Sequence, residues 1–298
     1  MSTLADRVVV ITGAGRGLGR AHALYMAALG ARVVVNDLGS DVHGAGADSS
    51  PASAVVAEIE RAGGVAIASH HDVADWEQAA AMVALAVEAF GGLDVLVNNA
   101  GIVRDRTLAN LSEAEWDAVL RVQLKGTVAP TRHAVAYWRE RAKAGAPVKA
   151  SVIHTSSIAG LFGNFGQANY ASAKLALLAF SRVVSLEVGR YGVRSNCVSP
   201  SARTRISLTI PDAGDAAAPA DGFDPLEPAN VSPVVAWLAS EDCPADGQIL
   251  HVHGDEVLVF SMPEIRDRVR AGGRRWTPAE LDRELSPRLL TPPSIEEI

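Results

Sequence analysis

Tyr170, Lys174 and Ser157 are the residues whose types and spacing could carry out chemistry. Tyr170 and Lys174 lie four positions apart in NFGQANYASAK, and Ser157 lies thirteen positions before Tyr170. Side chains at i and i+4 share one face of a helix, so the lysine ammonium could lower the pKa of the phenol, which is about 10 for an ordinary tyrosine. A phenolate is a suitable general base for a secondary alcohol that loses hydride, and Ser157 could orient the substrate oxygen. Alone, however, such a pair occurs often by chance and is more often simply a solvated pair on an exposed helix.

A glycine-rich loop after the first apolar run could bind a dinucleotide. In TGAGRGLGRA, Gly13, Gly17 and Gly19 match G-x-x-x-G-x-G, whereas Leu18 occupies the last glycine position of the stricter G-x-G-x-x-G pattern. Glycines allow a tight turn and bring the N–H groups of a helix N-terminus close to a pyrophosphate. The loop alone is weak evidence, because glycine-rich turns between strands and helices are common.

Two charged residues give opposite indications about the cofactor. Asp37 ends the second apolar run, where a carboxylate can accept hydrogen bonds from ribose hydroxyls and would repel a 2′-phosphate. Arg16, within the glycine loop, could instead meet that phosphate. We give Asp37 more weight, because placing like charges together is the costlier arrangement, and expect NAD rather than NADP. Asp72, which ends the third run, could hold the adenine or could be an N-cap or loop residue.

Short β-branched runs alternate with longer alanine-rich and leucine-rich segments. The runs cover residues 7–12, 31–37, 64–69, 93–98, 150–155, 193–199 and 247–252, and helices are expected near 17–29, 52–62, 75–90, 113–142, 169–190 and 231–239. Ser112 begins a capping box, and Pro233 is suited to a first helical turn. Continuous apolar strands that alternate with helices predict a doubly wound α/β sheet of about seven parallel strands.

Composition and the remaining segments set the organisation of the chain. Residues 1–260 are expected to form one domain, with a substrate loop at about 203–230 and a charged C-terminal extension at 261–298. A net charge of −7 on 298 residues argues against nucleic acid as the main partner. Two distant cysteines, and histidines without a third partner at ligand spacing, predict no metal site. The N-terminus is not signal-like and no apolar stretch reaches about 20 residues, so we expect a cytoplasmic protein that does not enter a membrane.

Several motifs together resemble the short-chain dehydrogenase/reductase family. TGAGRGLG, NNAG at 98–101, and the spacing of the serine, tyrosine and lysine follow the family's order over roughly residues 5–255. The resemblance implies a Rossmann-type sheet, a nicotinamide cofactor, an alcohol or ketone substrate, and a homodimer or homotetramer built on the long helices. VVVNDLGSDVHGAG, NNAGIVRDRTL and GNFGQANYASAK are similar to the (3R)-hydroxyacyl-CoA dehydrogenase units of peroxisomal multifunctional enzymes type 2, also called 17β-hydroxysteroid dehydrogenase type 4, and to bacterial single-domain relatives.

The resemblance also assigns roles to individual residues. Asn99 would lie near the ribose and nicotinamide, Asn98 would only tie strand backbones, and Thr204 would touch the nicotinamide carboxamide. Gln123 stands where most of the family has a fourth catalytic residue, an asparagine that helps to hold a water in a proton relay. The implied cofactor-binding residues are Gly13, Arg16, Gly17, Leu18, Gly19, Asp37, Asp72, Val73, Asn99, Ala100, Gly101, Tyr170, Lys174, Pro200 and Thr204.

Three functions remain open on the sequence. The first is an NAD-dependent dehydrogenase of 3-hydroxyacyl-CoA or steroid-like alcohols. The second, suggested by Arg16, is an NADP-dependent reductase of small ketones or 3-oxoacyl-acyl-carrier-protein thioesters. The third, suggested by Gln123 and the unusual extension, is a catalytically silent nucleotide-sensing or scaffolding protein. Five arginines at 266, 268, 270, 274 and 275 could meet CoA phosphates or could pair with acidic residues at a surface or subunit contact, whereas the acidic substrate loop does not suit CoA.

Overall fold

A single sheet organises the computed structural model, which describes residues 4–209, 222–261 and 263–289. Within these residues, eight strands lie in the order β3-β2-β1-β4-β5-β6-β7-β8. The first seven strands in this sheet order, which begins with β3 and reaches β7, are all parallel to their neighbours. The last strand, β8, pairs with β7 in the antiparallel direction. The strands are β1 (Val8–Thr12), β2 (Arg32–Asn36), β3 (Val65–Ser69), β4 (Val95–Asn98), β5 (Ala150–Thr155), β6 (Val193–Ser201), β7 (Ile249–His253) and β8 (Glu256–Phe260).

The predicted doubly wound sheet is confirmed, with one strand more than expected. The seven predicted runs correspond to β1 through β7, whereas β8 was not predicted. Gly254 and Asp255 connect β7 to β8, and Gly254 has a φ of 58°, which a two-residue hairpin turn requires. An antiparallel strand therefore forms one edge of an otherwise parallel sheet.

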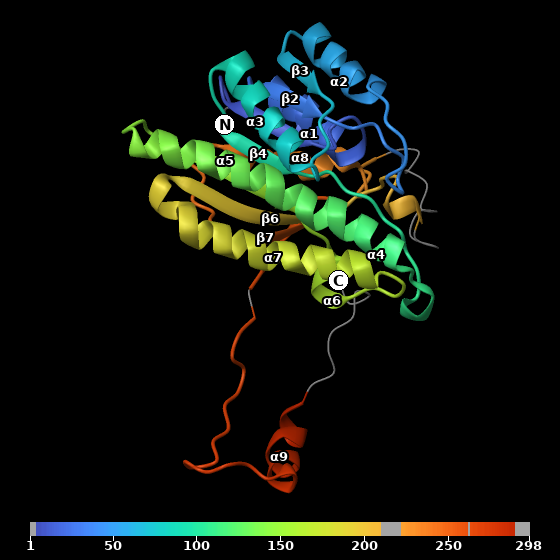
Figure 1. The fold of residues 1–298 in the computed structure, drawn as a ribbon, viewed down its shortest axis with the longest axis vertical. Coiled ribbons are helices and arrows are strands. Elements are labelled where there is room, and N and C mark those ends of the chain that lie inside the picture. Colours follow the sequence, from blue (N-terminus) through green and yellow to red (C-terminus); the bar gives the residue numbers. More distant parts are fainter. Residues whose placement is uncertain (1–3, 210–221, 262, 290–298) are drawn as a thin grey trace.

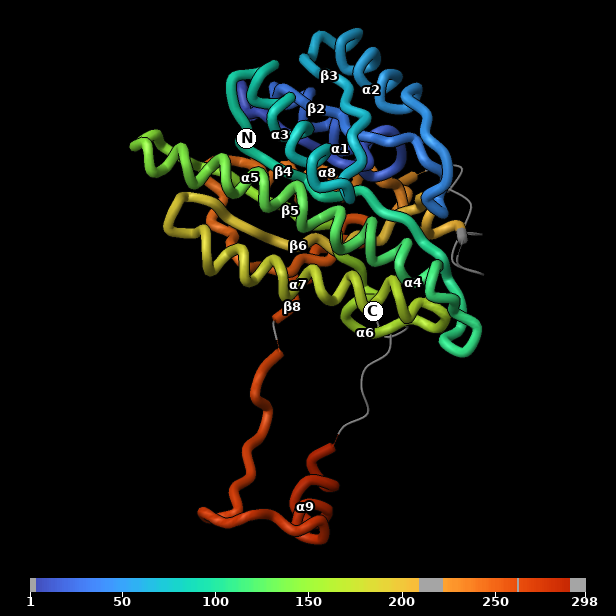
Figure 2. The backbone as a smooth tube through the Cα atoms, in the orientation of Figure 1, coloured from blue at the N-terminus to red at the C-terminus, as the bar shows by residue number. Residues whose placement is uncertain are grey.

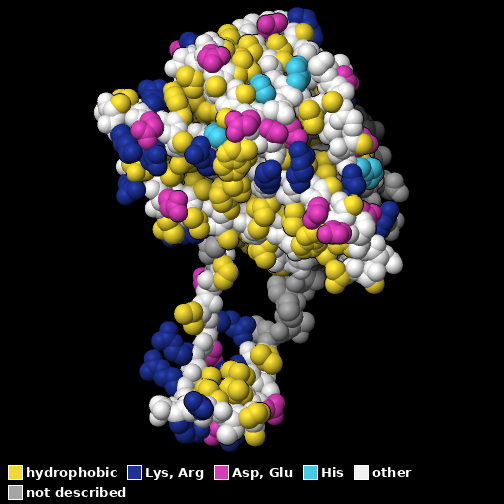
Figure 3. Space-filling view, in the orientation of Figure 1, with side chains coloured by type: hydrophobic (Ala, Val, Ile, Leu, Met, Phe, Trp, Pro, Cys, Tyr) yellow, Lys and Arg dark blue, Asp and Glu magenta, His cyan; other side chains and the backbone are white. Residues whose placement is uncertain are grey.

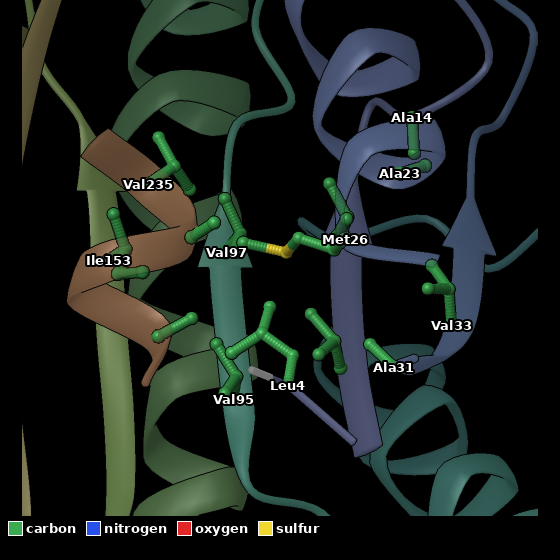
Figure 4. Packing of buried hydrophobic residues seen from close by; sticks show 14 of the residues in the cluster. Leu4, Ala14, Ala23, Met26, Ala31, Val33, Val95, Val97, Ile153 and Val235 are labelled. Carbon is green, nitrogen blue, oxygen red and sulfur yellow. The ribbon is translucent and has the colours of Figure 1, made fainter. Parts of the chain in front are cut away.

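Helices cover both faces of the sheet (Figure 1). One apolar cluster joins α1 (Gly17–Ala28), α2 (Ser50–Arg61) and α8 (Ser232–Ala239) to the sheet. In Figure 4, Met26 of α1 points toward Val97 of β4 within this cluster. A second cluster joins α3 (Trp76–Phe90), α5 (Gly126–Lys143) and α7 (Ala168–Val188) to the opposite face. Because both faces are buried, the parallel strands are apolar along almost their whole length.

The helix predicted over residues 113–142 is interrupted by a π-helical turn. α4 (Glu113–Leu120) begins at Ser112, whose side chain and that of Glu115 complete the expected capping box. Residues 121–125 then form the π turn, and α5 follows directly and ends at Lys143. A π turn inserts one extra residue into the helix, and such turns are common at functional sites. Here the turn includes Gln123.

The segment after β8 extends away from the sheet (Figures 1 and 2). It contains α9 (Pro278–Leu285), which begins with a capping box at Thr277, and its surface carries several Arg side chains (Figure 3). The remaining short helices are α6 (Ile158–Phe162) and the 3₁₀ turns Leu108–Asn110, Gly189–Tyr191, Ser207–Thr209, Pro228–Val231 and Ser286–Arg288. None of the helices in the described ranges is long and apolar enough to cross a membrane.

Candidate active site

A cavity of about 440 Å³ lies at the carboxyl ends of the parallel strands. The lining includes residues that follow β1, β2, β4, β5 and β6. Open α/β sheets bind their ligands at this edge, outside the carboxyl ends of the strands. Of the predicted site residues, the cavity lining includes Gly13, Arg16, Gly17, Leu18, Asp37, Asp72, Val73, Asn99, Ala100, Gly101, Gln123, Ser157, Tyr170, Lys174, Pro200 and Thr204. The sheet therefore brings together residues that are far apart in the sequence.

The glycine loop forms one wall of the cavity. Gly13 has a φ of 64°, and a Cβ placed on Gly19 would lie only 2.3 Å from the Gly13 carbonyl oxygen. Both positions therefore need glycine for the fold of the loop itself. Gly17 and Leu18, at the start of α1, line the cavity, and the first N–H groups of a helix have no partner within the helix. This wall fits the phosphates of a dinucleotide.

Asp37 supports the glycine loop from the end of β2. Its Oδ2 accepts a hydrogen bond from Gly15 N at 2.8 Å, and its Oδ1 accepts one from Gly39 N at 2.7 Å. The residue is 9% exposed and lines the cavity. Asp72 also lines the cavity, but its carboxylate pairs with Arg121 at 2.5 Å and caps the turn at Ala74.

The NNAG segment is tied to the glycine loop by hydrogen bonds. The buried Thr12 hydroxyl accepts from Asn99 N at 2.9 Å and from Ala100 N at 3.0 Å. The Asn99 amide donates to the carbonyl groups of Thr12 and Gly13. The expectation that Asn98 ties strand backbones was wrong, because the Asn98 amide donates to the Thr131 hydroxyl of α5 and lies 3.2 Å from His154 Nδ1. The backbone tie belongs to Asn99.

Tyr170, Lys174 and Ser157 meet on the opposite wall. Ser157 follows β5 and is the N-cap of α6, where its Oγ accepts from Ala159 N at 3.2 Å. Tyr170 and Lys174 are buried on α7, and the Lys174 Nζ lies 5.5 Å from the centroid of the Tyr170 ring. Lys174 Nζ also donates to the carbonyl oxygen of Thr155 at 2.6 Å. The pair is therefore a buried one, not a solvated one.

Burial dominates the electrostatics of this cluster. It raises the pKa of Tyr170 to about 12, with a further increase from the charge of Asp105, while a hydrogen bond to Ser157 acts in the opposite direction. Burial also lowers the pKa of Lys174 to about 7. A neighbouring ammonium was expected to lower the pKa of Tyr170, whereas the pKa is raised. The main cause is desolvation of the phenolate. In addition, Lys174 loses part of its charge near neutral pH, because its own pKa is lowered by burial. Burial therefore favours the protonated form of the phenol in this cavity.

Gln123 is buried beside the cavity on the π turn. Its Nε2 donates to the carbonyl oxygen of Ile102 at 2.8 Å, and its Oε1 has no hydrogen-bond partner within the described residues. A Cβ on Gly101 would lie 2.6 Å from Gln123 Nε2, so glycine leaves room for the longer amide. The unpaired carbonyl oxygen is an acceptor available to a water or a ligand group.

The loop after β6 lies against the glycine loop. The Thr204 Cγ2 would be 3.7 Å from a Cβ placed on Gly17. Arg203 forms an ion pair with Asp224 at 2.6 Å, which joins the two described ends of the predicted substrate loop. Three of the residues that make this loop acidic, Asp212, Asp215 and Asp221, lie outside the described residues.

The comparison with known families identifies this arrangement. A family model described as short chain dehydrogenase matches residues 7–207. The chain belongs to the short-chain dehydrogenase family. It is therefore an oxidoreductase that acts on CH–OH groups, in a family that uses a nicotinamide cofactor.

Relatives of this short-chain dehydrogenase narrow its place within the family. It is 44% identical to hydroxyacyl-CoA dehydrogenase ChsB1 of Mycobacterium tuberculosis, over 93% of this chain and 87% of that protein. It is 42% identical to peroxisomal multifunctional enzyme type 2 of Mus musculus, over 83% of this chain but only 31% of that protein. A crystal structure of a short chain dehydrogenase from Mycobacterium avium is 47% identical, with a TM-score of 0.87, and the match covers 98% of this chain and 99% of that one. The expected likeness to the dehydrogenase unit of the multifunctional enzymes is confirmed.

Some cavity residues of this short-chain dehydrogenase were not found from the sequence. Gln167 Nε2 donates to Asp105 Oδ2 at 2.8 Å, and Asn164 Nδ2 donates to Gln167 Oε1 at 2.9 Å. Asn164, Gln167 and Arg205 all line the cavity. The signal for them was their position beside predicted residues, since Gln167 precedes Tyr170 by three and Arg205 follows Thr204. Groups of three or more metal-ligating side chains were not found among the described residues.

Proposed function

We propose that this enzyme is an NAD-dependent dehydrogenase of 3-hydroxyacyl-CoA or of steroid-like secondary alcohols. The observation that carries the proposal is the meeting of Ser157, Tyr170 and Lys174 in the cavity that also contains the glycine loop. The 44% identity to a hydroxyacyl-CoA dehydrogenase over nearly the whole chain supports the substrate class.

In this proposal each residue of the cluster has one task. A nicotinamide cofactor bound in this cavity would supply the acceptor for the hydride of the carbinol carbon, or the hydride donor for the ketone. Ser157 hydrogen-bonds the substrate oxygen and holds it next to the Tyr170 hydroxyl. In the reductive direction the protonated Tyr170 phenol gives its proton to the substrate oxygen, and in the oxidative direction the Tyr170 phenolate, which higher pH favours, takes the O–H proton as hydride leaves. Lys174, whose Nζ donates to Thr155, lies beside the phenol, where its charged form favours the phenolate, and it has further N–H donors for the cofactor ribose. Gln123 Oε1 offers an acceptor for a relay water.

Asp37 and two arginines bear on the choice of cofactor. The Asp37 carboxylate favours NAD, because it can accept from ribose hydroxyls and repels a 2′-phosphate. Arg16 and Arg205 line the same cavity and favour the alternative, an NADP-dependent reductase of ketones or 3-oxoacyl-acyl-carrier-protein thioesters. We give NAD more weight, because Asp37 is buried at the strand end whereas Arg205 is exposed.

We further propose that the enzyme is a homodimer or homotetramer. Leu175, Val183 and Leu186 on the outer face of α7 are between 48% and 66% exposed among the residues that the structure describes, and an exposed apolar surface of this kind is typical of a subunit contact. The extension offers less support for a CoA site than its composition suggested, because Arg274 pairs with Glu280 at 2.6 Å. A cytoplasmic location remains our expectation.

A substrate panel with a tyrosine variant tests the function. The wild-type protein is assayed with acyl-CoA, steroid and small alcohols and ketones, each with NAD(H) and NADP(H). Tyr170→Phe should abolish turnover while it leaves the Kd for NADH within about twofold, because only the phenolic proton is lost. Tyr25→Phe, on the outer part of α1 and 38% exposed, is the matched control and should be fully active. Turnover by Tyr170→Phe would refute the mechanism, and a strong preference for NADPH would refute the role of Asp37. NADH binding without turnover of any substrate would favour the nucleotide-sensing alternative.

A further inference from the structure

Three stretches of this chain lie side by side at the cavity. They are the ones that are similar to the multifunctional enzymes, residues 33–46, 98–108 and 163–174, and each contributes to the cavity lining. Val103 N of the second stretch donates to the carbonyl oxygen of Val42 in the first at 3.1 Å. The third stretch contacts the second and carries the proposed base. Segments far apart in the sequence therefore form one layer of paired segments around that base.

The second and third stretches are paired immediately before Tyr170. Arg106 N donates to the carbonyl oxygen of Gly166 at 2.8 Å, and Arg106 forms an isolated parallel β-bridge with Gln167. The Gln167 side chain adds a further contact, because its Nε2 donates to Asp105 Oδ2 at 2.8 Å. The segment that begins α7 is therefore fixed to the chain that follows NNAG.

Asn169 makes the next of these contacts and touches Tyr170 directly. It is fully buried, and its Nδ2 donates to the carbonyl oxygen of Arg104 at 3.0 Å and, over a longer distance of 3.4 Å, to that of Glu115. Its Oδ1 accepts from Tyr170 N at 2.8 Å. The first N–H groups of a helix have no partner within the helix, so this acceptor fixes the backbone of Tyr170 at the start of α7.

The Tyr170 ring is enclosed by the same stretches. It packs in an apolar cluster with Ile102 and Val103 of the second stretch, and Val42 of the first packs against this cluster. Close-packed side chains have little freedom to move independently of their neighbours. The position of the ring therefore depends on how the second stretch is fastened to the start of α7.

We propose that Gln167 and Asn169 are positioning residues that hold the Tyr170 hydroxyl within reach of the substrate oxygen. They do so by fastening the start of α7 to the segment after NNAG, and the inference rests on the role of Tyr170 in the proposed function. Gln167 lines the cavity, but its Oε1 accepts from Asn164 Nδ2 at 2.9 Å and its Nε2 donates to Asp105, so this amide is engaged within the protein. Proton transfer needs the phenol within hydrogen-bond reach, and a displacement of about 1 Å can cost about a hundredfold in rate.

Exchange of the partners in the Asp105–Gln167 pair tests the proposal. Gln167→Glu brings two carboxylates together and should lower kcat by at least about tenfold, whereas KM and the Kd for NADH should stay within about twofold. Adding Asp105→Asn restores one donor and one acceptor with their roles reversed, so the double variant should recover kcat to within about threefold of the wild type. The comparison uses kcat on the plateau of each pH profile, where the altered charges no longer change the protonation of Tyr170. Gln248→Glu is the matched control and should keep kcat, because Gln248 is exposed and its amide donates to the Asp246 carbonyl group.

A second variant tests the other side chain. Asn169→Asp keeps the acceptor for the next N–H but loses the donor to Arg104, so kcat should also fall by at least about tenfold. Asn110→Asp is its control, because Asn110 is exposed, and should keep kcat. If two carboxylates prevent folding, Gln167→Met removes the same donor without adding charge and should lower kcat to the same extent. Thermal unfolding and NADH titration show that each variant is folded and binds the cofactor.

The outcomes separate positioning from other roles of these side chains. Wild-type kcat in Gln167→Glu or in Asn169→Asp would overturn the assignment of that residue, and a double variant no more active than Gln167→Glu would overturn the role of the pair. A rise in KM at constant kcat would also overturn it, because the amide would then bind the substrate itself. Turnover by Tyr170→Phe contradicts the proposed function, whereas an inactive Tyr170→Phe together with an insensitive Gln167→Glu contradicts only the positioning role.

Discussion

The Thr12 hydroxyl offers a direct test of how the cavity is held together. Thr12 is 1% exposed, and its Oγ accepts from two main-chain amides, Asn99 N at 2.9 Å and Ala100 N at 3.0 Å. Thr12→Val keeps the shape of the side chain but removes the acceptor, so both partly buried N–H groups lose a partner. An unsatisfied buried donor costs about 1–3 kcal/mol, and partial burial reduces the cost of each, so we expect a total loss of about 2–3 kcal/mol in the free energy of unfolding.

A serine variant provides the control for this prediction. Thr12→Ser keeps the hydroxyl and loses one methyl group, which should cost only about 1 kcal/mol. Urea unfolding followed by circular dichroism, at one fixed protein concentration, gives both values. Since the same hydroxyl joins the glycine loop to the NNAG segment, the valine variant should also bind NADH more weakly than the serine variant. If the two variants unfold within about 0.5 kcal/mol of each other, the hydroxyl is not the link that the hydrogen bonds indicate.

Two further predictions concern charge. The charge of Asp105 raises the pKa of Tyr170, so Asp105→Asn should move the pH profile of kcat/KM for alcohol oxidation to lower pH. The new amide oxygen can still accept the hydrogen bond from Gln167, which keeps the local structure. An unmoved profile would contradict this prediction. Burial places the pKa of Lys174 at about 7 in the folded protein, below the value near 10.5 in the unfolded chain. Between these two pH values the folded protein binds fewer protons than the unfolded chain. The free energy of unfolding should therefore rise with pH over this range. Urea unfolding from pH 7.5 to 9.5 should show this rise in the free energy of unfolding. Lys174→Met should reduce its slope by up to about 1.4 kcal/mol per pH unit. An equal slope in both proteins would be evidence against the lowered pKa of Lys174.

Features that depend on a few neighbouring residues could be predicted from the sequence. The capping boxes at Ser112 and Thr277 and the turn at Gly13 all form where their residue types require them. The order of apolar runs was also sufficient for a parallel sheet, because strands buried on both faces leave a continuous signal. β8 was missed for the same reason, since its Glu256–Phe260 segment is partly exposed at an edge and lacks that signal. The Gly254–Asp255 hairpin turn was the available clue.

Features that depend on contacts between distant segments could not be predicted. The helical pattern of residues 113–142 is continuous, and nothing local marks the π turn at Gln123. Spacing placed Asn98 and Asn99 at the end of a strand but did not decide which amide faces the Thr12 carbonyl. The pKa of Tyr170 depends on how completely three helices and the sheet exclude water, which a four-residue spacing to Lys174 cannot show.

The hydrogen bonds in the cavity separate groups that maintain the fold from groups left for a ligand. One Asp37 oxygen and the amide of Asn99 are engaged by the glycine loop, and the other Asp37 oxygen accepts from Gly39 N, so substitutions of Asp37 or Asn99 would alter this wall before they altered recognition. In contrast, Lys174 uses one of its three protons on Thr155, and the Ser157 oxygen accepts from a main-chain amide while its own proton remains free to reach the phenol or the substrate. The groups with unused hydrogen-bonding capacity are those to which the proposed mechanism assigns contact with the substrate and cofactor.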